Sequence, residues 1–235
     1  MKNPKFLFPK IFILFFFILI VSSCIKNDGT IIGDAKVRIF NTVISDTARN
    51  FFFNNGLFAG ATGQSALSTS TNSSYFVVVA DRDYSVDARN SITGVSNGAV
   101  DYNFALGKNY SIFYTKADNL PATKPQLVVY EDMVRPNANM AQIKFINMGY
   151  TLGSDVMITD RGGNYKETIG RGKFTEYLKI SDVDTNAATI FLNLVDSVGV
   201  VDSISYKGLA KGKVYTVIIE GTSRGKLKER LVSNN

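Results

Sequence analysis

The sequence contains no histidine, no tryptophan and a single cysteine among its 235 residues. Without histidine, neither a Ser-His-Asp triad nor a Cys-His pair can be assembled, and the commonest zinc ligand is missing. One cysteine cannot form an internal disulfide, so a folded body must be stabilised by burial of apolar surface. We therefore expect a protein that is not an enzyme and that carries no cofactor.

A charged and apolar leader precedes the cysteine. The first ten residues hold three lysines and no acidic residue, which is typical of the start of a signal peptide. The apolar run that follows has about 11 residues, well short of the roughly 20 that a membrane-spanning helix needs. It ends in Val21-Ser22-Ser23-Cys24, which resembles the lipobox of bacterial lipoproteins. The sequence predicts a signal peptide over residues 1–23, cleaved before Cys24, and fatty acyl chains such as palmitate on Cys24.

Lipidation of Cys24 predicts that the protein resides in the cell envelope, anchored to a membrane through its N-terminal lipid. We expect the outer membrane. Residues 24–34 are short, polar and glycine-bearing, so they are expected to form a tether. Lys26-Asn27-Asp28 loosely matches the acidic stretch that serves some Gram-negative lipoproteins as a surface-export signal. The periplasmic and the outer face both remain open.

The charge of the chain argues against nucleic acid as a partner. The net charge of +6 falls to about +3 once the lysine-bearing leader is removed. The remaining Lys and Arg residues are scattered and form no dense stripe interleaved with aromatic residues. Attachment to the membrane is therefore expected to be covalent rather than electrostatic.

The body of the protein contains an internal repeat. Residues 35–41 (AKVRIFN) are echoed by residues 141–147 (AQIKFIN), and residues 107–114 by residues 212–219, at offsets of about 105 positions. The first echo predicts half-buried strands that end in asparagine, and the second a Gly-Lys turn that leads into a strand. Two echoes at nearly one spacing predict tandem copies of one β domain, over residues 35–134 and 140–235.

Short strand signals recur at close intervals within the first copy, and no long segment has helical periodicity. Strands are expected at residues 50–53, 75–80, 84–88, 100–105 and 126–130. A hairpin is expected at residues 51–58, because Asn55-Gly56 tolerates the positive φ angles of a tight turn. Residues 60–74, rich in Ser, Thr, Gly and Asn, are either a mobile loop or the crossing between sheets, and could serve recognition. The spacing predicts an all-β fold of two tandem immunoglobulin-like β-sandwich domains.

These features resemble the family called domain of unknown function 4397, tandem β modules common in envelope-anchored bacterial proteins. The resemblance rests on the asparagine-ended opening strand of both copies, on the Gly-Lys-x-Tyr strand, and on the Asn- or Asp-led strands of residues 50–56 and 155–162. The proline-rich stretch that the family often carries is absent, since residues 42–49 contain no proline. The resemblance implies architecture and location, and it carries over no functional residues.

Paired carboxylates are the remaining candidates for catalysis, because two of them across a cleft can hydrolyse glycosides without histidine or metal. The candidates are Asp81, Asp83, Glu131, Asp132, Asp182 and Asp184. All are expected at strand ends or turns, where carboxylates commonly bind backbone amides, so a structural role is preferred. Asp182-Val183-Asp184 also begins like a calcium loop, but Ala187 and Asn193 stand where that loop needs Gly and Glu, and no metal site is expected.

Tyrosine is the residue best suited to contact a glycan in this chain, which contains 11 of them. The candidates for ligand binding are Tyr102, Tyr110, Tyr114 and Tyr130. At alternating strand positions a tyrosine is more often a partly buried sheet residue whose hydroxyl reaches water. The sequence thus predicts a non-catalytic envelope module that binds a protein or a glycan, or supports envelope structure. The alternative is a glycan-binding accessory lipoprotein of an outer-membrane uptake system, which would use these tyrosines and residues 60–74.

Overall fold

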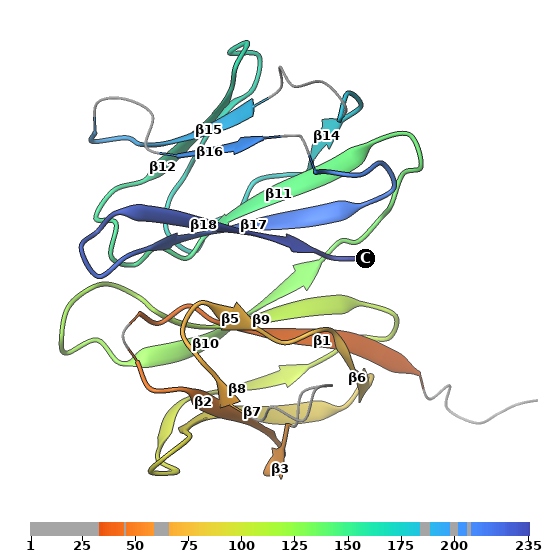
Figure 1. Ribbon diagram of the computed structural model, residues 1–235. Helices are drawn as coiled ribbons and strands as arrows, with labels where there is room; N and C mark the ends of the chain where they lie inside the picture. Colours follow the sequence, from red (N-terminus) through yellow and green to blue (C-terminus); the bar gives the residue numbers. More distant parts are fainter. Residues whose placement is uncertain (1–32, 45, 59–65, 184–188, 198–201, 206–207) are drawn as a thin grey trace, which may run out of the picture. The chain divides into compact units, whose positions relative to one another are not determined.

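The computed structural model describes residues 33–44, 46–58, 66–183, 189–197, 202–205 and 208–235 (Figure 1). Within these ranges the chain forms 18 strands and no helix, so the prediction of an all-β fold is confirmed. None of the described segments is a helix of the length and apolarity needed to cross a membrane. The predicted signal peptide and Cys24 lie outside the described residues.

The first module, residues 34–132, is a sandwich of two sheets. Its interface sheet, named for the second module that it faces, contains β1 (Asp34–Asn41), β5 (Thr71–Asn72), β6 (Phe76–Val79), β9 (Asn109–Lys116) and β10 (Pro125–Asp132). Its distal sheet contains β2 (Arg49–Phe53), β3 (Gly56–Leu57), β4 (Ala66–Leu67), β7 (Asp83–Asn90) and β8 (Ser96–Asn103). Each strand expected from the sequence of this module is present, with shifts of a few residues at the ends.

The second module, residues 141–233, has the same plan. Its interface sheet contains β11 (Ala141–Asn147), β14 (Leu178–Ile180), β17 (Val214–Gly221) and β18 (Leu227–Ser233). Its distal sheet contains β12 (Val156–Asp160), β13 (Lys166–Ile169), β15 (Thr189–Leu194) and β16 (Asp202–Ser205). In both modules the opening strand runs parallel to a late strand, with Asn41 opposite Tyr114 and Asn147 opposite Ile219.

The two asparagines that end the echoed strands perform the same task in each module. The Asn41 side chain donates to the Leu67 carbonyl at 2.9 Å and accepts from the Val43 amide at 3.1 Å. Asn147 donates to the Ile169 carbonyl at 3.1 Å and accepts from the Gly149 amide at 3.0 Å. Each therefore ties its interface sheet to the distal sheet and supports the turn that follows the strand.

The Gly-Lys-x-Tyr echo also has one structural meaning in both modules. Gly107 and Gly212 have φ angles of +70° and +79°, a conformation that glycine adopts without steric cost. The side chain of the tyrosine three residues later folds back over the glycine turn. Its hydroxyl accepts from the Ala105 amide at 3.1 Å in the case of Tyr110, and from the Ala210 amide at 3.0 Å in the case of Tyr215.

The hairpin expected at residues 51–58 is present, but its turn lies one residue earlier than predicted. Phe53 pairs with Gly56, and the two turn residues are Asn54 and Asn55, with φ angles of 48° and 66°. Asparagine tolerates this left-handed region because its short polar side chain can hydrogen-bond locally, so no glycine is required there.

The described part of the segment expected as a loop at residues 60–74 is the crossing between sheets. β4 pairs with β2 in the distal sheet, and β5 pairs with β1 in the interface sheet. The segment therefore changes sheets within a few residues, and its Ser73 hydroxyl accepts from the Ile39 amide at 2.9 Å. Residues 60–65 lie outside the described residues.

The described residues contain three apolar clusters enclosed by the four sheets. One lies within each sandwich, and the third lies between the two interface sheets. As a result β11 and β17 are buried along their whole length, whereas the sequence predicted half-buried strands at β1 and β11. Alternation alone cannot reveal that a second sheet covers the polar face. Residues Gly33–Asn235 accordingly cluster as one compact unit, and the two domain bounds expected from the sequence stay a prediction.

Candidate functional site

The interface between the modules has an apolar centre. The rings of Phe40 and Phe113 stack with their centroids 4.6 Å apart and an angle of 9° between their planes. Ile146, Met148 and Ile218 of the second module pack against them. These side chains are buried, so separation of the modules would expose a continuous apolar surface to water.

Beside this centre lies a buried charge cluster organised by Asp132, the last residue of β10. Arg38 and Lys144 approach its carboxylate to 3.6 Å and 3.4 Å. All three residues are at most 4% exposed. Tyr75 donates to the same carboxylate at 2.7 Å, and the Ser111 hydroxyl also donates to it. Because the carboxylate is fully paired, its burial is compatible with a stable fold.

Residues near the C-terminus complete the pairing of Arg38. Its guanidinium donates to the Asn234 side chain at 2.7 Å and to the Ser233 carbonyl at 3.2 Å. Arg38 also lies over the ring of Tyr75, 4.6 Å from its centroid. Burial raises the pKa of Tyr177 to about 12, and the nearby Asp132 carboxylate adds to the rise. With its donors occupied, Arg38 is a structural residue.

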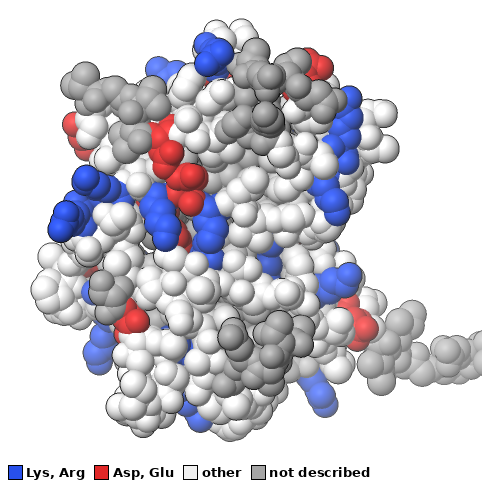
Figure 2. Space-filling view, in the orientation of Figure 1, with Lys and Arg blue, Asp and Glu red and all other residues white. Residues whose placement is uncertain are grey.

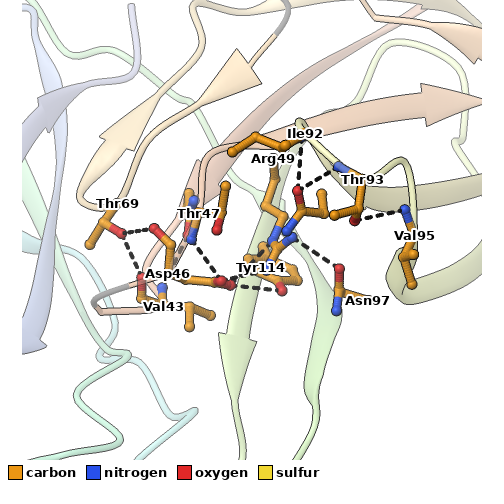
Figure 3. A network of polar contacts seen from close by, with 12 residues as sticks. Val43, Asp46, Thr47, Arg49, Thr69, Ile92, Thr93, Val95, Asn97 and Tyr114 are labelled. Atoms are coloured by element: carbon orange, nitrogen blue, oxygen red, sulfur yellow. Dashed lines mark hydrogen bonds and ion pairs between the residues drawn. The ribbon is translucent and has the colours of Figure 1, made fainter.

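A second polar network closes one end of the first module (Figure 3). In the turn between β1 and β2, the Asp46 carboxylate accepts two hydrogen bonds from Arg49 and one from the Tyr114 hydroxyl, the latter at 3.1 Å. Arg49 also donates to Asn97 at 2.9 Å, and Thr69 donates to the Val43 carbonyl at 2.8 Å. Burial and the nearby Asp46 raise the pKa of Tyr114 above its ordinary value. We call this set of residues the clamp.

The corresponding end of the second module has no such clamp among its described residues. Ile219 stands opposite Asn147 where Tyr114 stands opposite Asn41, and Val156 begins β12 where Arg49 begins β2. Neither aliphatic side chain can form the hydrogen bonds of its counterpart. Instead of a network, this end holds an open hollow of about 500 Å³, which we call the open pocket. It is lined by Gly149, Tyr150, Gly153, Ser154, Asp155, Arg171, Val195 and Asp196.

A smaller hollow of about 270 Å³ adjoins the open pocket and shares Arg171 with it. Both modules contribute to its walls, since Lys116 and Tyr130 come from the first module and Gly172 from the second. The Tyr130 hydroxyl donates to the Gly172 carbonyl at 2.9 Å across the interface. Tyr150 forms a further link, because its hydroxyl accepts from the Ile44 amide at 2.9 Å. The two hollows therefore lie where the modules meet.

The four tyrosines expected to bind ligand do not form one exposed group. Tyr110 and Tyr114 are 3% and 0% exposed, and their hydroxyls serve the turn and the clamp described above. Tyr102 packs against Tyr110 with the ring centroids 5.5 Å apart. Tyr130 is half-buried in the wall of the smaller hollow. Ligand binding by the set stays a prediction, and Tyr130 is the member with a hollow beside it.

The candidate carboxylates are likewise dispersed. Asp81 occupies a turn position with a φ angle of 54°, and Asp83 accepts from the Asn103 side chain at 2.9 Å. Glu131 forms an exposed ion pair with Lys108 at 2.7 Å, and Asp132 lies in the buried cluster. Asp182 makes contacts of its own, while Asp184 and most of the calcium-like segment lie outside the described residues.

Charged side chains of both signs lie on the face of the molecule that Figure 2 draws. On the face drawn in Figure 2, acidic and basic side chains are interspersed, and neither sign forms a continuous stripe. Among the described residues, no group of three or more His, Cys, Asp or Glu residues is placed to hold a metal ion.

Sequence reasoning missed the residues of the open pocket. Arg171, Asp155 and Asp196 lie in three different loops, and only the fold brings them together. A signal was nevertheless present in the repeat, because the second copy has Ile219 where the first has Tyr114. A comparison of the copies position by position would have indicated that the two ends differ.

Comparison with known proteins gives one family and 13 remotely similar structures. The family model of domain of unknown function DUF4397 matches residues 35–157, more than half of the chain. No curated protein matches the sequence.

Three of the similar structures have low TM-scores. The family 26 carbohydrate-binding module CBMbc of Eubacterium rectale Amy13K, solved with maltoheptaose, is 12% identical, with 86% of this chain and 97% of that chain covered and a TM-score of 0.26. The Bacillus anthracis TIE protein is 9% identical, with 81% and 35% covered and a TM-score of 0.23. A putative polysaccharide-binding protein (DUF1812) of Bacteroides thetaiotaomicron is 8% identical, with 84% and 98% covered and a TM-score of 0.21. Scores this low transfer no ligand to this chain.

Proposed function

The chain belongs to the family of domain of unknown function DUF4397, and from this premise we propose that it is a non-catalytic binding module of the cell envelope, held to a membrane by lipid on Cys24. The open pocket carries the proposal. Two copies of one fold have been joined, and the end that is closed by the clamp in the first copy is open in the second. Concave, largely pre-formed hollows that carry a few polar groups are the usual places for ligand binding.

The rigidity of the scaffold supports a role in binding. The interface buries aromatic rings and a paired charge cluster, and Tyr130 and Tyr150 link the two modules at the rim of the hollows. A pre-organised site loses little conformational freedom when a ligand binds, which favours affinity. Neither of the two modules needs to move for the pocket to exist.

The residues available for chemistry support a non-catalytic role. The chain has no histidine, and its one cysteine is the expected lipidation site. Three of the candidate carboxylates of the first module already have partners, since Glu131 pairs with Lys108, Asp83 accepts from Asn103, and Asp132 lies in the buried cluster. The carboxylates that do line the open pocket, Asp155 and Asp196, are exposed to water, whereas the carboxyl groups of general acids are usually set among burying or charged neighbours.

The leader and the position of Cys24 support the anchor. We expect the mature protein to fractionate with membranes and to be released into the soluble fraction by Cys24→Ala, because acyl chains supply the attachment. Protease treatment of intact cells then reports the face of the membrane. Cleavage from outside indicates surface display, and protection indicates a periplasmic location. If Cys24→Ala fractionates with membranes as the native protein does, the lipid anchor is wrong.

A further inference from the structure

Resting on the proposed binding function, we propose that the open pocket and its adjoining hollow bind a neutral, polyhydroxylated ligand, namely a segment of a glycan chain. The loops that build the pocket are counterparts of those that build the clamp. The turn between β1 and β2 corresponds to residues 148–155, and the crossing near Thr69 corresponds to the segment that holds Arg171. The two copies therefore differ at one equivalent place, where one is filled by its own side chains and the other is not.

The charged groups of the open pocket are unoccupied. Within the described ranges, the side chains of Asp155, Arg171 and Asp196 form no hydrogen bond or ion pair. In the first module, by contrast, Asp46 and Arg49 occupy each other. Two carboxylates and one guanidinium thus line the same hollow without hydrogen-bonding to each other, and they can form hydrogen bonds to a ligand.

The balance of these groups indicates the chemistry of the ligand. Asp155 and Asp196 only accept hydrogen bonds when ionised, whereas Arg171 only donates them. Lys116 lines the smaller hollow, where its ammonium already donates to the Leu120 carbonyl at 3.1 Å, and the carboxylate of Asp118 lies near both cations. An anion would be attracted by the cations and repelled by the carboxylates, and a cation the reverse. A hydroxyl group donates and accepts, so adjacent hydroxyls can satisfy both kinds of group without adding net charge.

The dimensions and the aromatic wall favour a chain of sugar rings over a single small polyol. The two hollows, of about 500 and 270 Å³, meet at Arg171 and are together in the range of ordinary ligand sites. Tyr130 lines the smaller one, and its ring contacts the exposed Phe174 with the centroids 5.8 Å apart. Aromatic faces of this kind offer flat apolar surface next to polar groups, which suits the two sides of a sugar ring.

The test is calorimetric titration of the full chain, purified in detergent, with four neutral hexasaccharides built from glucose, mannose, galactose or xylose, and with a zwitterionic dipeptide. We expect at least one hexasaccharide to bind and the dipeptide not to bind. Arg171→Ala and Asp155→Asn should each weaken that binding by about tenfold or more, since each removes a charge-assisted hydrogen bond. Both side chains are exposed, so the melting temperature should not change.

Matched controls are Arg161→Ala and Asp101→Asn, which alter exposed residues of the same kinds away from the pocket and should leave the affinity unchanged. The inference is overturned if no hexasaccharide binds at about 10 mM, if Arg171→Ala leaves the affinity unchanged, or if the dipeptide binds in an Arg171-dependent way. The last two outcomes leave a binding function in place with another site or ligand. Failure of the Cys24→Ala fractionation experiment would reject the anchor and leave this result untouched.

Discussion

Arg38 and Lys144 occupy matching positions in the two echoed opening strands, and their side chains converge on one carboxylate from opposite sides of the module interface. That carboxylate, Asp132, ends the last strand of the first module just before the chain enters the second. Each cation is at most 4% exposed. In an isolated module each of these cations would face solvent. In the pair of modules both are buried between the two interface sheets, where they share Asp132.

Removal of the shared carboxylate should therefore destabilise the protein strongly. Asp132→Ala is expected to lower the free energy of unfolding by about 3–5 kcal/mol, because it leaves two buried cations uncompensated. Urea denaturation of the purified protein measures this. The neighbouring Glu131→Ala serves as the control and should cost less than about 1 kcal/mol, because its ion pair with Lys108 is exposed. Equal losses in the two variants would contradict the structural role of Asp132.

The two asparagines that end β1 and β11 should contribute equally to the stability of the protein. Asn41→Ala and Asn147→Ala each remove two buried hydrogen bonds and leave a carbonyl and an amide without a partner. We expect each substitution to cost about 2–4 kcal/mol, the sum of two unsatisfied groups at the lower end of their usual range. Denaturant melts compare them directly. If only one of the two substitutions lowers the free energy of unfolding, the two asparagines do not have the same structural role.

The shared interface should make the two modules unfold together. We expect scanning calorimetry of the native protein to show a single transition, because each module buries one face against the other. Phe113→Ala removes one ring of the stacked pair and should cost about 3–5 kcal/mol. Two resolved transitions in the native protein would show that the interface contributes little to stability.

The acidic pair formed by Glu229 and Asp202 should make stability depend on pH. Burial, together with a hydrogen bond and repulsion from Asp202, raises the pKa of Glu229 from 4.5 to about 7. The folded state then holds a proton that the unfolded state releases, so stability should fall as the pH rises from about 4.5 to about 7 and level off above that range. Glu229→Gln should flatten this part of the curve, whereas the matched Glu176→Gln should not. Stability that rises with pH in both proteins would refute the assignment.

Local sequence patterns were sufficient to predict the strands of the first module. Each Gly-Lys turn places a glycine at a positive φ angle just before a strand, at Gly107 and at Gly212. Glycine adopts this angle without steric cost, so the turn can be recognised from the sequence. The hairpin turn was misplaced by one residue, because asparagine and glycine both tolerate the left-handed region and Asn54-Asn55-Gly56 offers two choices of turn. Only the pairing of Phe53 with Gly56 decides between them.

The candidate site was much less accessible to sequence reasoning. Tyr110 and Tyr114 were candidates for ligand contact, yet one closes a turn and the other completes the clamp. Arg171, Asp155 and Asp196 carried no motif at all. A pocket formed by several loops has no period and no fixed spacing in the chain, so its residues cannot be recognised before the loops are placed.

The sequence by itself determined the all-β class, the tandem repeat and the Gly-Lys turns, because alternation, turn chemistry and self-similarity are local properties of the chain. Only the tertiary structure decided that the polar faces of two sheets would be buried against each other, that Asp132 would serve both Arg38 and Lys144, and that one module end would be clamped and the other open. These features depend on contacts between residues far apart in sequence, and a strand's own pattern is the same whether its polar face meets water or a second sheet.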